Sequence, residues 1–250
     1  MGTASHKAEL PISPVNLRIG VITFPGTCDD RDAAYAVELL GCEAVPLWYQ
    51  DTDLKGVDGV IVPGGFSFGD YLRCGAISRF APIMDALRDF ADNGGRVLGI
   101  CNGFQILTEA GLLPGALTRN VNMHFRHRIV HLKNAQGKVH AIWLKSGEGR
   151  YIHPDIEALD AAGQVWLRYV NPDGSAAREG DDANPNGAMG AIAGVKNAQG
   201  NVAGLMPHPE HSVDPALGGL VDGRDLILEH LVTPRLGTED WVNGLLAAKE

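Results

Sequence analysis

Short apolar runs alternate with amphipathic segments over the first part of the chain. The runs have the length of buried strands and span Ile19–Phe24, Ala44–Trp48, Gly59–Pro63 and Val97–Ile100. Between them, Asp30–Leu40 and Ile77–Phe90 carry apolar residues at helical spacing, and the glycines at 41 and 94–95 are typical helix ends. Strands that alternate with helices predict parallel strands joined by right-handed crossovers, with helices on both faces of the sheet.

The second part of the chain is richer in strands. Its apolar runs are Ile129–Leu132, Val139–Leu144, Val165–Tyr169, Ala191–Val195 and Val202–Leu205. Turns rich in asparagine and glycine separate several of them, which indicates antiparallel pairing. The polar segment Asp173–Gly187 predicts a surface loop, and two helical segments are expected after Arg224, on either side of Pro234. We therefore predict an α/β fold: an open, mostly parallel sheet with helices on both faces and antiparallel additions in the C-terminal half.

The composition is that of one folded unit. With 250 residues, 45% of them hydrophobic and 20% charged, the chain can bury a full core. Residues 1–16 are polar and contain no apolar run, so we expect a flexible N-terminal segment, neither signal peptide nor membrane span, and a single domain over 17–250. The net charge of −9 argues against nucleic acid or an anionic membrane as the main partner, because phosphate recognition needs basic stripes.

Cysteine usage indicates the compartment. The four cysteines, Cys28, Cys42, Cys74 and Cys101, lack the paired spacing of a zinc site. A disulfide framework is also unusual in a chain of this length without a secretion signal. We therefore expect reduced thiols, a cytoplasmic location and no bound metal.

A strand that turns at once into a helix is predicted to end at Cys101. Residues 96–105 read Arg-Val-Leu-Gly-Ile-Cys-Asn-Gly-Phe-Gln, with Gly99 and Gly103 two positions to either side of the cysteine. Such a corner holds a nucleophile in a tight, strained turn, with its sulfur exposed above the sheet. It also aims the positive end of the following helix at the sulfur, which favours the thiolate. Taken alone, the pattern is equally compatible with a buried core cysteine.

A histidine and a carboxylate occur together near the other end of the chain. His208 stands between Pro207 and Pro209, after the apolar run Val202–Leu205, and a residue that precedes proline favours extended backbone. In an extended segment, residues two apart project to the same side, so His208 and Glu210 are predicted to lie side by side. The pair would supply a general base and the carboxylate that orients it.

Backbone donors for a developing oxyanion are predicted after the strand that precedes the glycine pair at 64–65. A turn of this kind can point N–H groups into one concavity. We assign this role to the backbone N–H groups of Gly65 and Asn102. Nucleophile, base, carboxylate and donors together predict acyl transfer through a covalent intermediate.

Basic side chains gather in one stretch of the chain. They are the histidines His124, His127 and His131 and the arginines Arg119, Arg126 and Arg128. The histidine spacing matches no recognised metal-ligand set, so a solvated face or a docking rim is the better interpretation, and the sequence leaves these two open. Arg73 is equally open between an ordinary surface arginine, a group of the substrate pocket and a partner contact.

Three motifs resemble those of the class I, triad-type glutamine amidotransferases. They are Gly-Ile-Cys-Asn-Gly-Phe-Gln at 99–105, Pro-Gly-Gly-Phe-Ser-Phe-Gly-Asp-Tyr-Leu-Arg at 63–73 and Met-Pro-His-Pro-Glu at 206–210. The 63–73 run, with Gly-Glu-Gly-Arg-Tyr at 147–151 and Asn-Pro-Asn-Gly at 184–187, is similar more narrowly to the glutaminase subunits of phosphoribosylformylglycinamidine synthases. The resemblance extends from about Leu17 to Asp214.

The chain departs from the pattern of that family at three positions. Ser146 stands where the family usually has histidine, Ala188 where it has serine and His211 where it has arginine. None of these positions belongs to the predicted triad. They bear on partner docking and on the loop around 146–151.

The resemblance implies a glutaminase that hydrolyses L-glutamine to glutamate and ammonia through a cysteine thioester, with Cys101, His208 and Glu210 as catalytic residues. It implies that the ammonia passes to a separate synthetase subunit, which uses ATP and Mg²⁺ to convert formylglycinamide ribonucleotide to formylglycinamidine ribonucleotide in de novo purine biosynthesis. A small third subunit would bridge the two. The chain has no G-x-x-x-x-G-K-[ST] loop, so we expect no cofactor in it, and we expect low activity until the complex forms.

Two other interpretations keep the same strand-to-helix corner. The first is a cysteine hydrolase, peptidase or chaperone-like protein of a related α/β fold, against which the His-Pro-Glu motif argues. The second is a regulatory subunit without activity, which an intact triad disfavours.

Overall fold

The computed structural model describes residues 16–179 and 181–233. Its strands are β1 (Arg18–Thr23), β2 (Glu43–Trp48), β3 (Gly59–Val62), β4 (Arg96–Ile100), β5 (Ala116–Thr118), β6 (Arg126–Asn134), β7 (Val139–Ser146), β8 (Arg150–Ile152), β9 (Val165–Val170), β10 (Ile192–Lys196) and β11 (Val202–Leu205). Its α-helices are α1 (Asp30–Leu39), α2 (Ile83–Asp92), α3 (Asn102–Glu109), α4 (Ile156–Ala161) and α5 (Gly223–Ile227). The predicted flexible segment, up to residue 15, and the helical segment beyond Pro234 lie outside the described residues.

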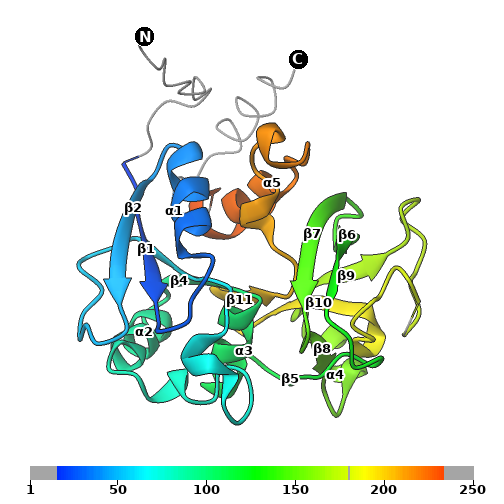
Figure 1. Cartoon of the computed structure of the whole chain (residues 1–250), viewed down its shortest axis with the longest axis horizontal. Helices are drawn as coiled ribbons and strands as arrows, with labels where there is room; N and C mark the ends of the chain where they lie inside the picture. Colours follow the sequence, from blue (N-terminus) through cyan, green and yellow to red (C-terminus); the bar gives the residue numbers. More distant parts are fainter. Residues whose placement is uncertain (1–15, 180, 234–250) are drawn as a thin grey trace.

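A nine-stranded sheet in the order β2-β1-β3-β4-β11-β10-β9-β6-β7 forms the centre of the protein. Neighbours from β2 to β11 run parallel, whereas those from β11 to β7 run antiparallel. Figure 1 shows the antiparallel strands, coloured green to yellow, together on one side of the parallel strands. The predicted fold class, with a parallel core and antiparallel additions in the second half, is confirmed.

The parallel strands are short and apolar because they are covered on both faces. Every residue of β3 and of β11 is buried, which is typical of strands between two layers of helices. The connection from β1 to β2 and the one from β3 to β4 run across the sheet in opposite directions. Right-handed crossovers therefore place α1 and α2 on opposite faces, and the order of the strands reverses between β1 and β3. A crevice at the carboxyl ends of the strands is expected at such a reversal.

The antiparallel half curls back toward the parallel half. Strand β7 is the last strand of the sheet, yet Trp143 on β7 forms an isolated antiparallel bridge with His208, which follows β11. The backbone N–H of His208 donates to the carbonyl oxygen of Trp143 at 2.7 Å. The end of β7 thus lies against the carboxyl edge of the parallel strands.

One predicted helix begins later than its apolar spacing suggests. We expected a helix over Ile77–Phe90, but Ser78–Phe80 forms a separate 3₁₀ turn and α2 begins at Ile83. The cause is Pro82, because the residue before a proline avoids helical backbone, and Ala81 accordingly adopts φ −67° and ψ 143°. The prediction of one continuous helix is wrong.

Two further differences concern the second half of the chain. The described residues of the expected surface loop Asp173–Gly187 are exposed or half-buried up to residue 183, but residues 184–187 at its end are buried. The small sheet of β5 and β8 and the short helix α4 were not predicted. Helix α5 continues as a π-helix over Leu228–Val232. Among the described residues, no helix combines the length and the apolar character that crossing a membrane requires.

Candidate active site

Cys101 occupies the corner between β4 and α3 in a strained conformation. Its φ of 50° and ψ of −105° lie outside the regions that non-glycine residues prefer. The neighbouring glycines are required by close packing. A Cβ on Gly103 would stand 1.8 Å from the carbonyl oxygen of Val62, and one on Gly99 would stand 2.8 Å from the backbone of Gly103. The predicted corner is therefore confirmed, together with its need for small residues.

The sulfur lies at the wall of a pocket rather than above the sheet. Cys101 is only 8% exposed, so the expectation of an exposed sulfur is wrong, but the residue lines a pocket of about 250 Å³. The thiol is positioned to donate to the carbonyl oxygen of Lys145, with Sγ 3.7 Å from that atom. A solute that enters this pocket reaches the sulfur without any opening of the core.

His208 and Glu210 form a buried pair beside Cys101. Nδ1 of His208 is 2.6 Å from Oε1 of Glu210, and the two residues are 0% and 1% exposed. Cys101 and His208 come together because β4 and β11 are parallel neighbours, and the N–H of Cys101 donates to the carbonyl oxygen of Leu205 at 2.9 Å. The sequence separation of nucleophile and base is thus spanned by one strand pairing.

The predicted pairing is confirmed, but its local explanation is wrong. We expected an extended segment in which residues two apart share a side. Instead, Pro209–His211 forms a 3₁₀ turn directly after His208. Proline at the first position of this turn has the φ that the turn requires, and the turn folds Glu210 back onto the imidazole.

The surroundings of His208 favour its protonated form. Burial lowers its pKa, but the negative charges of Glu210 and Cys101, with the hydrogen bond to Glu210, outweigh burial and raise the pKa to about 10. Nε2 of His208 is buried and makes no hydrogen bond among the described residues. With Nδ1 occupied by Glu210, Nε2 is the atom left to exchange a proton with the Cys101 sulfur.

Asp29 and Lys145 extend the site and were not predicted. Asp29, 3% exposed, precedes α1 at the carboxyl end of β1, and Lys145 lies near the end of β7. Nζ of Lys145 is 2.5 Å from Oδ1 of Asp29, and both residues line the pocket with Cys101. Burial raises the pKa of the Asp29 carboxyl, but a hydrogen bond from His211 and the charges of His208 and Lys145 outweigh it, so the pKa lies well below its ordinary value.

His211 completes this group. Its Nε2 is 3.2 Å from Oδ1 of Asp29, and its ring contacts that of His208 edge-on, with the ring centres 5.4 Å apart. Asp29, His208, Glu210 and His211 each offer one ligand atom, and these four atoms lie within 4.8 Å of one another. They are the residues of the described part that could together hold a metal ion.

The predicted oxyanion donors lie at the expected places, although their role stays a prediction. Gly65 lines the pocket with Cys101. Asn102 is the first residue of α3, where a backbone N–H has no acceptor within the helix. Gly64 allows His208 to approach, because a Cβ there would stand 2.8 Å from Cε1 of the imidazole.

The loop after β7 is held by buried amides. The side-chain nitrogen of Asn186 donates to Oδ1 of Asn120 at 2.7 Å and to Oγ of Ser146 at 2.8 Å, while Asn120 donates to the carbonyl oxygen of Ser146 at 2.8 Å. The hydroxyl of Tyr169 donates to Asn186 at 2.8 Å. This network connects the Asn-Pro-Asn-Gly motif to the start of the Gly-Glu-Gly motif. Glu148 of the second motif lines the pocket, which gives a physical reason why the two motifs occur together.

The basic side chains noted in the sequence do not meet at one point. His127 stacks on Trp143, and Arg128 pairs with Asp182 at 3.0 Å. Among the described residues, the three histidines of this stretch form no group with metal-ligand spacing. Arg73 makes a two-pronged contact with Glu109, at 2.7 and 2.8 Å, outside the pocket lining.

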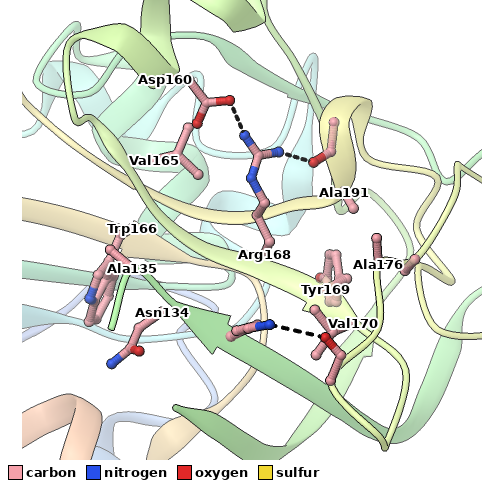
Figure 2. Close-up of a pocket in the computed structure, with 14 residues that line it drawn as sticks. Asn134, Ala135, Asp160, Val165, Trp166, Arg168, Tyr169, Val170, Ala176 and Ala191 are labelled. Atoms are coloured by element: carbon pink, nitrogen blue, oxygen red, sulfur yellow. Dashed lines mark hydrogen bonds and ion pairs between the residues drawn. The ribbon is translucent and has the colours of Figure 1, made fainter. Parts of the chain in front are cut away.

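A larger hollow, of about 420 Å³, lies over β9 in the antiparallel half (Figure 2). There Arg168 is held between Asp160 and the carbonyl oxygen of Gly190, and Nζ of Lys133 donates to the carbonyl oxygen of Gly174 at 3.2 Å. None of the residues that line this hollow is a cysteine or a histidine. The smaller pocket, which has a nucleophile and a base, is therefore the candidate active site.

Residues 16–224 match the family model of the CobB/CobQ-like glutamine amidotransferase domain. A strained cysteine corner, a buried histidine–glutamate pair and a parallel core define the same class. The chain is a glutamine amidotransferase of the triad type.

Similar proteins identify the family of this chain within the class of glutamine amidotransferases. The phosphoribosylformylglycinamidine synthase subunit PurQ of Mycobacterium tuberculosis (strain H37Rv) is 51% identical over 86% of this chain and 96% of the relative. The protein of the same name from Rhodococcus jostii (strain RHA1) is 54% identical over 84% and 94%. A structure of PurLQS from Thermotoga maritima matches with a TM-score of 0.75 at 35% identity, over 89% of this chain and all of that one. The chain belongs to the PurQ family of phosphoribosylformylglycinamidine synthase subunits.

Proposed function

We propose that the chain is the glutaminase subunit of a phosphoribosylformylglycinamidine synthase. It hydrolyses L-glutamine to glutamate and ammonia and delivers the ammonia to a synthetase subunit, which makes formylglycinamidine ribonucleotide for purine biosynthesis. The observation that carries this proposal is the pairing of Cys101 with the buried His208–Glu210 couple in one pocket. The PurQ names of the relatives and the PurLQS assembly support the purine-specific part.

The first half of the reaction forms a thioester. The Cys101 thiolate attacks the side-chain amide carbon of glutamine, and the carbonyl π electrons move onto oxygen, which accepts hydrogen bonds from the N–H groups of Gly65 and Asn102. When the carbon–nitrogen bond breaks, the leaving nitrogen takes a proton from Nε2 of His208 and departs as ammonia. The raised pKa of His208 suits it to hold that proton until then.

The second half of the reaction hydrolyses the thioester and regenerates the free enzyme. Neutral His208 removes a proton from water, which attacks the thioester carbon, and the carbon–sulfur bond breaks to release glutamate and the thiolate. Glu210 acts throughout by fixing the orientation and tautomer of the imidazole at 2.6 Å. In both halves the reacting side chains and the hydrogen-bond donors belong to this chain, and water is the second substrate.

The pocket fits a small zwitterion. Asp70 and Glu148 line it together with Cys101 and supply negative charge away from the sulfur, where the ammonium group of free glutamine would bind. The carboxyl of Asp70 is partly desolvated, and this burial raises its pKa. A partly desolvated carboxyl is suited to bind a charged ligand. An internal peptide bond has no free ammonium group at the corresponding distance from the scissile carbonyl.

Exposed apolar side chains form a rim around the pocket, which suits contact with the synthetase subunit. Phe66 and Phe125 line the pocket and are 52% and 56% exposed, and Tyr71 and Leu72, 74% and 88% exposed, stand in the segment between the pocket residues Asp70 and Cys74. Exposed apolar groups around a reactive site indicate a protein interface. We assign this rim to the synthetase subunit, so that ammonia leaves into a closed path rather than into water, where it would be protonated.

The remaining features follow from the same assignment. ATP and Mg²⁺ are used on the synthetase subunit, a small bridging subunit joins the complex, and the glutaminase itself needs no cofactor. We place the protein in the cytoplasm, where reduced thiols persist; the four cysteines are free in the structure. Residues 17–250 are proposed to act as one domain.

Substitution of the nucleophile tests the function. We expect Cys101→Ser to abolish release of ammonia from glutamine while the chain stays folded and still binds the synthetase subunit. Cys42→Ala, which removes a buried thiol that does not line the pocket, is the matched control and should retain turnover. Glutamine turnover by Cys101→Ser, or hydrolysis of peptides and esters but not glutamine by the wild type, would contradict the proposal. Labelling of Cys101 by a diazoketone analogue of glutamine gives a second readout.

A further inference from the structure

The group formed by Asp29, His208, Glu210 and His211 contains two more side chains than the triad needs. His208 and Glu210 suffice to orient a base, yet a second carboxylate and a second imidazole stand against them. Nδ1 of His208 is 3.6 Å from Oδ2 of Asp29, and Nε2 of His211 is 3.2 Å from Oδ1 of Asp29 and 3.7 Å from Oε1 of Glu210.

Three of these separations, 3.2, 3.6 and 3.7 Å, are close to the edges of a tetrahedral zinc site, and the two that involve Asp29 are measured to different oxygen atoms of its carboxylate. Zinc binds histidine nitrogen and carboxylate oxygen at about 2.0–2.2 Å, so ligand atoms at the corners of a tetrahedron lie roughly 3.3–3.5 Å apart. The contact between His208 and Glu210, at 2.6 Å, is the one that must open. Oε2 of Glu210 is buried and has no hydrogen-bond partner among the described residues, so this carboxylate has a second oxygen available as a ligand atom.

The local charge also suits a divalent cation. Asp29 and Glu210 are buried carboxylates, and Asp32 lies 3.9 Å from Nε2 of His211 at the surface. Lys145 is the lysine paired with this group, through Asp29. With both imidazoles neutral, three carboxylates and one ammonium leave a charge of −2, which one divalent ion cancels.

The group is open to ions. Asp29 lines the active-site pocket, and the side chain of His211 is 25% exposed. An ion can therefore reach Asp29 from the pocket and His211 from the surface without unfolding of the surrounding segments.

We propose that Asp29, His208, Glu210 and His211 form a binding site for Zn²⁺ and that the ion switches the active site off. A zinc ion on Nδ1 of His208 needs the lone pair of that nitrogen, so any remaining ring proton sits on Nε2. Nε2 then has no lone pair with which to accept the proton of the Cys101 thiol. The site is inhibitory, distinct from a cofactor site, and only this consequence for turnover rests on the proposed glutaminase function.

Equilibrium dialysis with Zn²⁺ tests binding directly. We expect one ion per wild-type chain, an equal result for Cys101→Ser, and a loss of affinity of at least tenfold for His211→Ala. His153→Ala, which removes a half-buried histidine outside the group, should bind as the wild type does. His211→Asn serves as a second variant should His211→Ala unfold, and thermal melts establish the folded state of each. Unchanged zinc affinity in the His211 variants, or no binding by the wild type, would overturn the proposal.

Cobalt reports which atoms hold the ion. Co²⁺ in a tetrahedral site of nitrogen and oxygen ligands absorbs in the visible region, whereas a thiolate ligand adds an intense near-ultraviolet band. We expect the first signal without the second. A thiolate band that disappears in Cys101→Ser would place the ion on the nucleophile and reject the site. If binding is found but the wild type hydrolyses no glutamine even without zinc, the metal site stands and the proposed function fails.

Discussion

Nζ of Lys145 and Oδ1 of Asp29 lie 2.5 Å apart, although 116 positions separate the two residues in the sequence. Asp29 precedes α1 at the carboxyl end of β1 in the parallel half, and Lys145 stands near the end of β7 in the antiparallel half. The pair joins the two halves at the pocket, next to the hydrogen bond between Trp143 and His208. The pair therefore affects both the stability of the contact between the two halves and the charge around His208.

Removal of Lys145 should destabilise the protein more than removal of an ordinary surface lysine. Lys145→Met leaves the Asp29 carboxylate, 4% exposed in its side chain, without its ammonium partner. A fully buried pair broken in this way costs about 3–5 kcal/mol, but the lysine is 32% exposed, so we expect roughly 1–3 kcal/mol. Lys138→Met, whose lysine is 49% exposed and pairs with Asp225, should cost less than about 1 kcal/mol. Urea unfolding of the two variants at neutral pH checks the difference.

The pH dependence of stability should reveal the charged state of His208. Its pKa rises in the folded protein from 6.5 to about 10, so its contribution is fully present below pH 6.5 and is lost as the pH rises toward 10. The free energy of unfolding should therefore fall between pH 7 and 9, by up to about 1.4 kcal/mol per pH unit. Glu210→Gln removes the first of the charges that raise the pKa and should flatten this slope. Identical slopes in wild type and variant would refute the assignment.

Local sequence signals predicted the nucleophile because its geometry is local. A strand, a cysteine and flanking glycines are contiguous, and the strain at Cys101 follows from that corner alone. The His208–Glu210 pair was also predicted, but by the wrong backbone: proline was interpreted as favouring extension, whereas Pro209 starts a 3₁₀ turn. In both conformations a two-residue spacing brings the side chains together.

Residues that act through tertiary contacts could not be predicted. Lys145 is one of several half-buried positions that alternate along β7, and nothing in that alternation shows that β7 returns to His208. Asp29 resembles any acidic residue at a helix start. The amide network around Asn186 is similar, because Asn120 reaches it from another loop and Ser146 from the end of β7. All of these contacts depend on the order of the strands in the sheet, and local sequence patterns do not reveal that order.

Gly103→Ala should disrupt the nucleophile corner. The added Cβ would meet the carbonyl oxygen of Val62 at 1.8 Å, and neither backbone can withdraw without separating α3 from β3. We expect a loss of at least about 2 kcal/mol of stability. Gly147→Ala is the control, since its Cβ would find its nearest neighbour, a ring carbon of Phe125, at 3.6 Å. A difference of less than about 0.5 kcal/mol between the two in urea unfolding would show that the corner can relax.

Leu72→Asp should uncouple the glutaminase from its synthetase. Leu72 is 88% exposed, so the substitution costs the isolated chain little stability, and basal glutamine hydrolysis should match that of the wild type. In the complex, the new carboxylate would have to lose its water against an apolar partner surface, which is strongly unfavourable.

We therefore expect at least tenfold weaker association with the synthetase subunit, and proportionally less stimulation of glutamine hydrolysis by it. Leu217→Asp, at a leucine 48% exposed outside the pocket lining, supplies the control and should leave both quantities unchanged. Calorimetric titration of each variant with the synthetase and bridging subunits, paired with an ammonia assay, measures them together. Normal association of Leu72→Asp would move the interface away from the rim, and weaker association of Leu217→Asp alone would move it to the surface around Leu217.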